Sequence, residues 1–279
     1  MAEVGIFVVP DAGDPALAVE QALVADGVGL DYVAVQDHPY QRRYFDTWTY
    51  LSYIAGRTAG VRLVPDVINL PLRPPAMLAK AAASLDVLSG GRVEIGLGAG
   101  SFWEAIEAMG GPRRTPRESV DALIEAIEIM RGFWSGERAL RHEGEHYRLA
   151  GAKPGPAPEH PIGIWIGAYG PRMLRVTGRL GDGWLPTLGG NYLSAEDVPP
   201  MQRAIDEAAR SAGRDPAAVK RVANLIGLEG EPSGWLDQLR RAAELGFEAL
   251  LVGVTGEDAE RFIRRLGEEV VPAFREQAA

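Results

Sequence analysis

The strongest constraint on the fold is an alternation of short apolar runs with longer helical segments along the whole chain. The apolar runs have the length and continuous hydrophobicity of strands that are buried on both faces. Glycine and proline mark the junctions between the two kinds of segment. The pattern predicts eight strands, at residues 4–9, 32–35, 61–69, 92–97, 162–166, 183–186, 221–227 and 248–254.

Helical spacing fills the stretches between these strands. It predicts helices at residues 16–25, 46–55, 74–88, 116–133, 171–180, 200–212, 234–245 and 257–275. Strands that alternate with helices form parallel sheets with helical crossovers. A doubly wound sheet has the same alternation, but eight units in 279 residues favour a closed (β/α)8 TIM barrel. We therefore expect an α/β fold in which residues 1–279 form a single barrel domain.

The alternation is interrupted after the fourth strand–helix unit, at about residues 135–161. Residues 145–149 look extended, and the proline-rich residues 153–158 are typical of a polyproline-type connector. We expect a small hairpin and loop inserted here, because the segment is too short for a domain.

Composition excludes several classes of function. The chain has no cysteine, which rules out a disulfide framework, a thiol nucleophile and a cysteine zinc or iron–sulfur site. The net charge of −9 argues against binding to nucleic acid or anionic membranes. The chain has neither a basic leader nor an apolar run of about 18 residues. We expect a cytoplasmic protein with a small-molecule partner and no metal site.

A TIM barrel carries its active site at the carboxyl ends of the strands, so polar residues at predicted strand ends are the first candidates. Asp37 and His38 follow the second strand, and an imidazole beside a carboxylate is a common proton donor–acceptor arrangement. A histidine before Pro39 could also serve packing or capping; we favour the catalytic interpretation. The other strand-end candidates are Asp11, Gln36, Asp66, Asn69, Gly98 to Glu104, Gly167 to Gly170, Thr187, Asn224 and Thr255.

Two glycine-rich segments follow strands. GLGAGS at residues 96–101 fails as a dinucleotide fingerprint, because it lacks the final glycine and its acidic partner falls inside a predicted helix. Its glycines would let a flat ligand approach or would simply form a tight loop. GAYG at residues 167–170 precedes a predicted helix, so it predicts either an anion cradle or an ordinary glycine turn.

Glu94 and the aromatic residues are weaker candidates. Glu94 lies in the fourth predicted strand and could place a carboxylate inside the barrel, although we favour a structural role. Several aromatic side chains stand near strand ends and could line an apolar pocket: Trp48, Tyr50, Phe102, Trp103, Tyr169 and Trp184.

Together these segments resemble a known family. VAVQDH at residues 33–38, the stretch at 74–100 that contains LDVLSGGRVEIGLGAG, and IWIGAYGP at 164–171 followed by GDGW at 181–184 occur in the family's order. The chain resembles the bacterial luciferase-like superfamily of flavin-dependent barrel enzymes over nearly its whole length. The stretch ending in GLGAG is its most specific part.

The resemblance implies a barrel that binds either the deazaflavin F420 or reduced FMN at the strand carboxyl ends. The pair of Asp37 and His38 is similar to the catalytic pair of the F420-dependent branch, whereas the luciferase branch usually has glutamate before the histidine. In that branch His38 would be the acid or base beside the cofactor ring, and Asp37 would orient it. The resemblance also implies a homodimer, formed by helices near the second and third strands.

The resemblance also assigns cofactor-binding residues. A non-prolyl cis peptide often supports the ring in the F420 branch, and Asp66–Val67 is the expected position here. The segment at 167–170 would hold the cofactor phosphate. The full set of implied cofactor-binding residues is Asp66, Val67, Asn69, Gly98, Gly100, Gly167, Ala168, Tyr169 and Gly170.

The chain departs from the sugar-phosphate dehydrogenases of this branch at one point. Those enzymes carry a glutamate in the loop after the fourth strand, where this chain reads GAGS and has its nearest acid at Glu104. We therefore expect an F420-dependent oxidoreductase that transfers a hydride to or from a small, largely apolar organic substrate. The alternatives are an FMNH2-dependent two-component monooxygenase with a separate flavin reductase and a non-catalytic flavin-binding protein.

Overall fold

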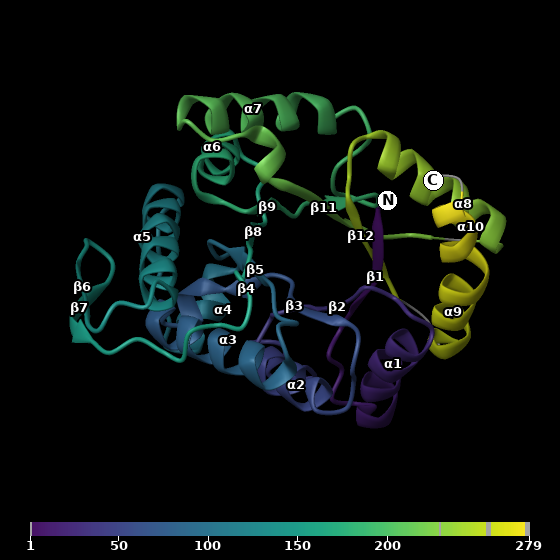
Figure 1. Cartoon of the computed structure of the whole chain (residues 1–279), viewed down its shortest axis with the longest axis horizontal. Helices are drawn as coiled ribbons and strands as arrows, with labels where there is room; N and C mark the ends of the chain where they lie inside the picture. Colours follow the sequence, from purple (N-terminus) through teal and green to yellow (C-terminus); the bar gives the residue numbers. More distant parts are fainter. Residues whose placement is uncertain (1, 229, 255–257, 277–279) are drawn as a thin grey trace.

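The computed structural model describes residues 2–228, 230–254 and 258–276. At its centre parallel strands form a barrel with helices around it (Figure 1). The barrel strands are β1 (Glu3–Val8), β2 (Tyr32–Val35), β3 (Arg62–Pro65), β4 (Ile68–Asn69), β5 (Ile95–Gly98), β8 (Ile164–Ile166), β9 (Gly183–Trp184), β10 (Thr187–Leu188), β11 (Lys220–Leu225) and β12 (Ala249–Gly253).

The strand order confirms the predicted TIM-barrel architecture. Neighbouring strands follow the order β3-β2-β1-β12-β11-β9-β8-β5-β4, with β10 beside β11. The two ends of this sheet meet where Leu63 N donates to Arg92 O at 2.7 Å and Glu94 N donates to Leu63 O at 3.0 Å. The predicted third strand is divided into β3 and β4. The predicted sixth strand is shortened to β9, and β10 follows just after its expected end.

Helices cover the outside of the barrel. Their bounds are α1 (Pro15–Gly27), α2 (Thr47–Ala55), α3 (Pro75–Ser89), α4 (Trp103–Ala108), α5 (Pro116–Trp134), α6 (Pro171–Leu180), α7 (Val198–Ser211), α8 (Pro232–Glu244), α9 (Ala259–Arg265) and α10 (Val271–Glu276). The short helix α4 was not predicted, and a wider turn at Leu266–Val270 divides the predicted last helix. The expected start of that helix, residue 257, lies outside the described residues. Within those residues, no helix is long and apolar enough to cross a membrane.

Local sequence explains why the long helix α5 begins and ends where it does. Thr115 accepts a hydrogen bond from the backbone of Glu118, and Glu118 accepts one from the backbone of Thr115, which completes a capping box. Pro116 occupies the first helical position, where its missing N–H costs nothing. Apolar residues then recur along the face that packs on α3, so the helix is held by its buried stripe.

The predicted insertion is a two-stranded antiparallel hairpin between α5 and β8. Its strands are β6 (Leu140–Glu143) and β7 (Arg148–Ala152), and it lies on the outer side of α5, away from the barrel strands (Figure 1). The Glu125 carboxylate of α5 accepts hydrogen bonds from Glu145 N at 2.8 Å and Tyr147 N at 2.9 Å. One half-buried side chain therefore anchors the hairpin turn.

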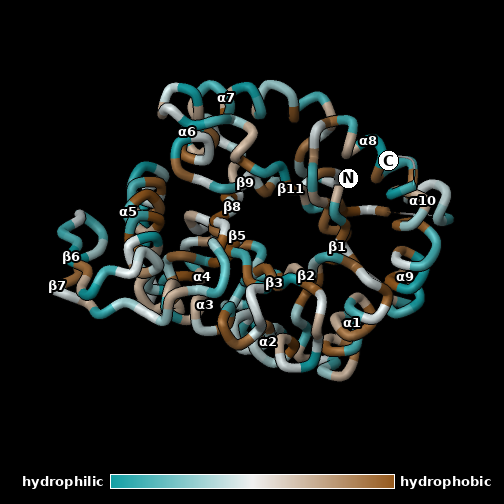
Figure 2. Tube along the Cα trace, viewed as in Figure 1, coloured by the Kyte–Doolittle hydropathy of each residue, from teal (hydrophilic) through white to brown (hydrophobic). Residues whose placement is uncertain are grey.

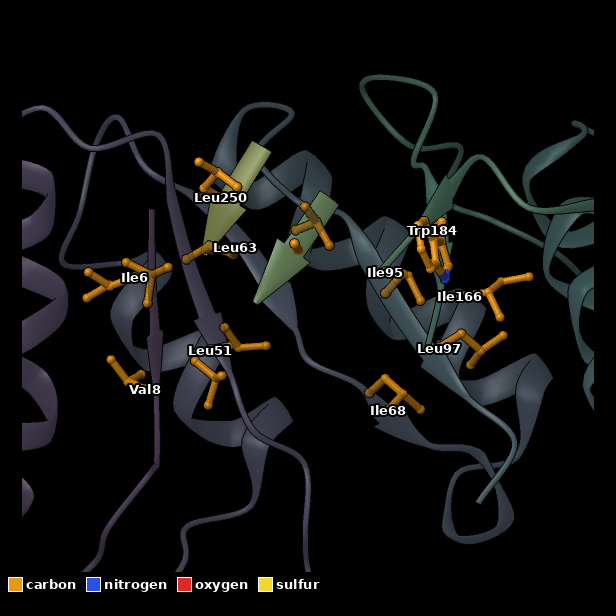
Figure 3. Packing of buried hydrophobic residues seen from close by; sticks show 14 of the residues in the cluster. Ile6, Val8, Leu51, Leu63, Ile68, Ile95, Leu97, Ile166, Trp184 and Leu250 are labelled. Atoms are coloured by element: carbon orange, nitrogen blue, oxygen red, sulfur yellow. The ribbon is translucent and has the colours of Figure 1, made fainter. Parts of the chain in front are cut away.

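The hydrophobic core has two layers. The outer layer lies between strands and helices and includes Ile6, Leu51 and Trp184 (Figure 3). Apolar stretches of the chain accordingly follow the strands, and hydrophilic stretches lie on the outer helices (Figure 2). A second layer fills the inside of the barrel with Tyr32, Ala34, Val64, Trp165, Leu185, Val222, Ala249 and Leu251. The barrel is a packed core, so ligands are restricted to its ends.

The amino-terminal end of the barrel is closed by a network of charges. Tyr32 Oη donates to Glu3 Oε2 at 2.7 Å, and Lys220 Nζ donates to Tyr32 Oη at 2.9 Å. Lys220 and Arg62 both form ion pairs with Glu3. Burial alone would raise the pKa of Glu3, but the hydrogen bonds from Lys220, Arg62 and Tyr32 lower it to about 2. This end is therefore internally paired.

Glu94 lies beside this network rather than at the opposite end of the barrel. Its carboxylate accepts a hydrogen bond from Gly163 N at 2.7 Å and faces the His160 ring, with 3.6 Å between the two groups. These contacts support the structural role that we favoured for Glu94.

Candidate active site

A cavity of about 1320 Å³ opens at the carboxyl ends of the barrel strands. Its volume exceeds the roughly 300–1,000 Å³ typical of a site for one drug-sized ligand, so it has room for two molecules. Most of the predicted site residues lie on its wall, where the fold brings together the ends of β2, β4, β5 and β8. These residues are Asp37, His38, Asp66, Val67, Asn69, Gly98, Gly100, Gly167, Tyr169 and Gly170.

Ala168 is the exception among the predicted cofactor-binding residues. It is fully buried in the outer core, and its carbonyl accepts a hydrogen bond from Trp184 Nε1 at 2.9 Å. Its neighbours along the chain, Gly167 and Tyr169, line the cavity, but Ala168 does not. The prediction for Ala168 is therefore corrected to a core position. Thr255, a weaker strand-end candidate, lies outside the described residues.

Asp37 has a different role from the one expected. Its buried carboxylate accepts hydrogen bonds from Arg73 Nε at 2.8 Å, from Arg73 Nη2 at 2.7 Å and from Asn69 N at 2.9 Å. In the part of the chain that the structure describes, no hydrogen bond joins Asp37 to the His38 ring. The expectation that Asp37 orients His38 directly is therefore corrected. Asp37 instead joins the end of β2 to the segment after β4 through a buried, two-pronged ion pair.

Arg73 was missed because its role depends on tertiary contact. It lies 36 residues from Asp37 and precedes a proline, which gave no signal of an ion pair. Its Nη2 also donates to Asp46 Oδ2 at 2.6 Å, and Asp46 caps the start of α2 through Thr49 N. One guanidinium thus connects the β2 loop with the helix that follows it.

His38 stands in an aromatic environment on the cavity wall. Its ring stacks on Tyr40 with 5.4 Å between ring centres and meets the Phe102 ring edge-on at 5.7 Å. Burial lowers the pKa of His38, although the charge of Asp37 opposes this shift. The imidazole is therefore neutral near pH 7 and has a ring nitrogen that can accept a proton. Tyr40 was not predicted as a site residue, because no pattern in the sequence indicated that it stacks on His38.

The segment between β3 and β4 forms one side of the cavity. The Asp66–Val67 peptide bond is cis, as the resemblance implied. The Val67 side chain packs against the glycines of neighbouring strands: a Cβ on Gly98 would lie 2.7 Å from Val67 Cγ2, and one on Gly167 would lie 3.4 Å from it. Gly98 is thus needed for close packing around Val67, which favours the tight-loop interpretation of that segment. The glycines still leave a wall without side chains facing the cavity.

Asp66 and Asn224 face each other across the barrel. Asn224 Nδ2 donates to Asp66 Oδ1 at 3.2 Å, and both side chains are buried. Two further oxygens on this part of the wall, Asp66 Oδ2 and Asn224 Oδ1, are buried without a hydrogen-bond partner among the described residues. Burial raises the pKa of Asp66 to about 7, despite the hydrogen bond from Asn224. Unpaired buried polar atoms are costly, so these oxygens indicate a polar ligand.

The predicted anion cradle lies at the start of α6. Gly170 occupies the helix N-cap, and no atom lies within 4 Å of the position that a Cβ would take there. Arg172 and Arg117 line the cavity beside it, and Arg172 Nη1 donates to Arg117 O at 3.0 Å. Both guanidinium groups form ion pairs with Asp121, so this cluster carries one net positive charge. That charge, the helix dipole and the backbone N–H groups at the start of α6 favour an anion at this end of the cavity.

Aromatic side chains surround the cavity mouth. Phe102 is 58% exposed and Tyr192 is 60% exposed, although both line the cavity. Tyr169 packs near Tyr192 with ring centres 6.5 Å apart, and its hydroxyl accepts a hydrogen bond from Thr187 N at 3.0 Å. No residue of the β6–β7 hairpin lines the cavity. The hairpin therefore does not shape the cavity, and the exposed rings of Phe102 and Tyr192 define its mouth.

Sequence comparison identifies a family and several relatives that this chain resembles. The sequence model of a family described as luciferase-like monooxygenase matches residues 2–228. An F420-dependent glucose-6-phosphate dehydrogenase from Intrasporangium calvum is 28% identical, over 94% of this chain and 95% of the relative. The enzyme of the same name from Gordonia bronchialis is 33% identical, over 83% of this chain and 70% of the relative.

Solved structures share the fold at lower sequence identity. An F420-dependent secondary alcohol dehydrogenase in complex with an F420–acetone adduct superimposes with a TM-score of 0.88 at 20% identity, covering 98% of this chain and 99% of the other. The coenzyme F420-dependent tetrahydromethanopterin reductase from Methanopyrus kandleri gives 0.82 at 22% identity, with the same coverage. The monooxygenase RslO1 from Streptomyces bottropensis gives 0.80 at 20% identity, again with the same coverage.

Proposed function

Because the chain belongs to the luciferase-like monooxygenase family, we propose that it is an F420-dependent oxidoreductase that transfers a hydride between the deazaflavin and a small organic substrate. The observation that carries this proposal is the match between the cavity and a planar cofactor with one polar edge and one anionic tail. Relatives named as F420-dependent enzymes over nearly the whole chain support the choice of deazaflavin.

The residues present fit such a cofactor. The free oxygens of Asp66 and Asn224 suit the polar edge of the ring, and the surface formed by Val67 and its glycine neighbours suits the flat face. Gly170 and Arg172 suit the phosphate of the tail. When bound, F420 accepts or supplies the hydride. The chain's part is to hold the ring, to position the substrate and to move the accompanying proton.

His38 is the residue that we assign to this proton. Its neutral ring nitrogen can accept the hydroxyl proton of an alcohol as the hydride leaves the substrate carbon, and can return it in the reverse direction. The stacked Tyr40 and the edge-on Phe102 hold the ring in place. Asp37 is a positioning residue, because its ion pair with Arg73 holds the backbone from which His38 extends.

We propose a small, largely apolar alcohol or carbonyl compound as the substrate. The cavity mouth is lined by Phe102, Trp103, Tyr192 and Met173, which favour apolar or ring-containing molecules. The relatives named above act on glucose 6-phosphate, but the loop at residues 98–101 of this chain has no acidic side chain.

We also propose a cytoplasmic homodimer. Tyr53 on α2, and Met77 and Leu88 on α3, are 55%, 62% and 84% exposed. Exposed large apolar side chains on two helices that contact each other are candidates for a protein interface. Sedimentation of the wild type and of Met77→Glu with Leu88→Glu would test this, since the double variant should shift a dimer toward monomer.

Equilibrium binding tests the proposed function directly. Purified protein is titrated with F420, FMN and FMNH2, and binding is followed by fluorescence. Tight F420 binding with weak binding of both FMN forms is the expected result. The opposite preference, with oxygen consumption in the presence of a flavin reductase, would assign the chain to the FMNH2-dependent monooxygenases. Turnover that is unchanged in His38→Ala would contradict the catalytic role of His38.

A further inference from the structure

The Asp66–Asn224 pair occupies a special position in the barrel. Asp66 follows β3 and Asn224 belongs to β11. With β3 and β4 counted as one interrupted strand, three strands separate these two in either direction around the barrel. Their hydrogen bond, 3.2 Å long, therefore spans the barrel above the packed interior. It forms a polar floor under the cavity, which both residues line.

The hydrogen-bonding atoms of this floor can be assigned one by one. Asn224 Nδ2 lies 3.2 Å from Asp66 Oδ1 and 3.5 Å from Thr187 Oγ1. In this orientation of the amide, Asn224 Oδ1 has no partner among the described residues. Asp66 Oδ1 is occupied by this contact, so Oδ2 remains. The floor thus offers two buried atoms on side chains that are hydrogen-bonded to each other, and Asn224 Oδ1 can act only as an acceptor.

The surroundings of Asp66 favour its neutral form. Burial raises its pKa to about 7, and no arginine or lysine among the described residues forms an ion pair with it. The titratable groups around it do not offset this: the Asp37 charge is paired with Arg73, and the Tyr169 hydroxyl has a pKa that burial raises further. His38, whose pKa is lowered, is neutral at the same pH. A protonated Asp66 converts Oδ2 from an acceptor into a donor.

We propose that protonated Asp66 donates a hydrogen bond from Oδ2 to a carbonyl of the cofactor ring, while Asn224 Oδ1 accepts one from the adjacent ring N–H. The pyrimidinedione edge of a deazaflavin presents a carbonyl beside an N–H, which complements this donor–acceptor pair. The inference rests on the proposed function and adds that cofactor binding requires one proton held at Asp66. No covalent bond to the cofactor is formed or broken.

The test is the dissociation constant of F420 between pH 6 and pH 8, measured by fluorescence on the full chain. Wild-type affinity should fall about tenfold across this range, because Asp66 ionises and loses its donor. Asp66→Asn keeps a neutral donor at the same place, so it should retain the low-pH affinity and lose this dependence. Asp66→Leu removes both atoms and should bind at least about tenfold more weakly at either pH.

Controls separate the origins of a pH effect. Asp11→Asn changes an exposed carboxylate at the same end of the barrel that does not line the cavity, and should behave as wild type. Ionisation of F420 itself affects every variant equally and cancels in the ratio of their dissociation constants. Infrared spectra give a second readout: the carbonyl band of protonated Asp66 should be present at pH 6, absent in Asp66→Asn, and shifted by F420.

The outcomes distinguish the two levels of the proposal. Identical pH profiles for wild type and Asp66→Asn, with F420 bound by both, would overturn the role of Asp66 and leave the proposed function standing. Failure of the wild type to bind F420 at any pH would overturn the proposed function together with this assignment. Thermal unfolding of Asp66→Leu confirms that weak binding is measured on folded protein.

Discussion

The two ends of the barrel treat buried polar groups in opposite ways. At the amino-terminal end, Glu3 is bonded by Tyr32, Arg62 and Lys220, and every partner comes from the protein. At the carboxyl-terminal end, Asp66 has one protein partner and one buried oxygen without any among the described residues. The closed network stabilises the fold, whereas the open pair is suited to a ligand.

The pKa values of Glu3 and Asp66 are shifted in opposite directions, because Glu3 has cationic partners and Asp66 has none among the described residues. Hydrogen bonds from its partners lower the pKa of Glu3 to about 2, so its contribution to stability is present above pH 4.5 and is lost as the pH falls toward 2. Burial raises the pKa of Asp66 to about 7, so its contribution is present below about pH 4 and is lost as the pH rises through 7. Ionisation of Asp66 therefore destabilises the ligand-free protein as the pH rises through neutrality.

The largest expected effect tests whether the buried ion pair at the cavity end contributes to the stability of the fold, as the ion pairs at the other end do. Arg73→Met leaves Asp37 buried and unpaired and should reduce the free energy of unfolding by about 3–5 kcal/mol. Arg43→Met breaks an exposed ion pair with Asp11 at the same end and should cost less than about 1 kcal/mol. Urea denaturation measures both; equal effects would contradict the structural role of the Asp37 pair.

The next effect has the opposite sign. Asp66→Asn should stabilise the free protein by about 2–4 kcal/mol at pH 8, because the variant avoids ionising a buried carboxyl. The gain should shrink as the pH falls and approach zero below about pH 3, where the carboxyl is neutral in both the folded and unfolded states. Thermal unfolding across this pH range checks the prediction. A variant less stable than wild type at pH 8 would show that the carboxylate is paired.

Glu3→Gln is the matched change at the closed end. It should destabilise the protein by about 1–2 kcal/mol at pH 7, a value reduced for the partial exposure of the network. F420 affinity should not change, since Glu3 does not line the cavity. Opposite signs for Glu3→Gln and Asp66→Asn in the same denaturation assay would confirm the contrast between the ends, and equal signs would break it.

The smallest expected effect lies outside the barrel. Glu125→Ala removes the acceptor for the backbone N–H groups of Glu145 and Tyr147. Amide exchange in the β6–β7 hairpin should become faster, with a change of about 1 kcal/mol or less in global stability. F420 affinity should stay at its wild-type value. A loss of affinity would mean that the hairpin reaches the cofactor.

Sequence reasoning recovered the architecture because the alternation of strands and helices is a local property. It also found Asp37 and His38, since polar residues that end an apolar run stand out in the sequence. It did not find the Arg73 partner of Asp37, because that contact joins residues far apart in the chain. The resemblance assigned the whole segment 167–170 to the cofactor, whereas the alternation of extended backbone turns Ala168 to the core and both of its neighbours to the cavity.

Asn224 shows the same limit more sharply. It was recognised as a polar residue in an apolar strand, but its partner Asp66 lies 158 residues earlier and across the barrel. Only closure of the barrel brings the two together. The unpaired oxygens that identify the cavity as a ligand site are a property of three-dimensional packing, and no sequence pattern reports them.

A crystal structure of the wild-type protein with F420 bound at pH 6 tests the central claim most directly. The account predicts the deazaflavin ring against Val67, with its polar edge within hydrogen-bond distance of Asp66 Oδ2 and Asn224 Oδ1. His38 should lie near the ring carbon that exchanges the hydride, and the cofactor phosphate should lie at Gly170. A ring bound elsewhere, or with its polar edge turned to solvent while these oxygens stay unpaired, would contradict the account.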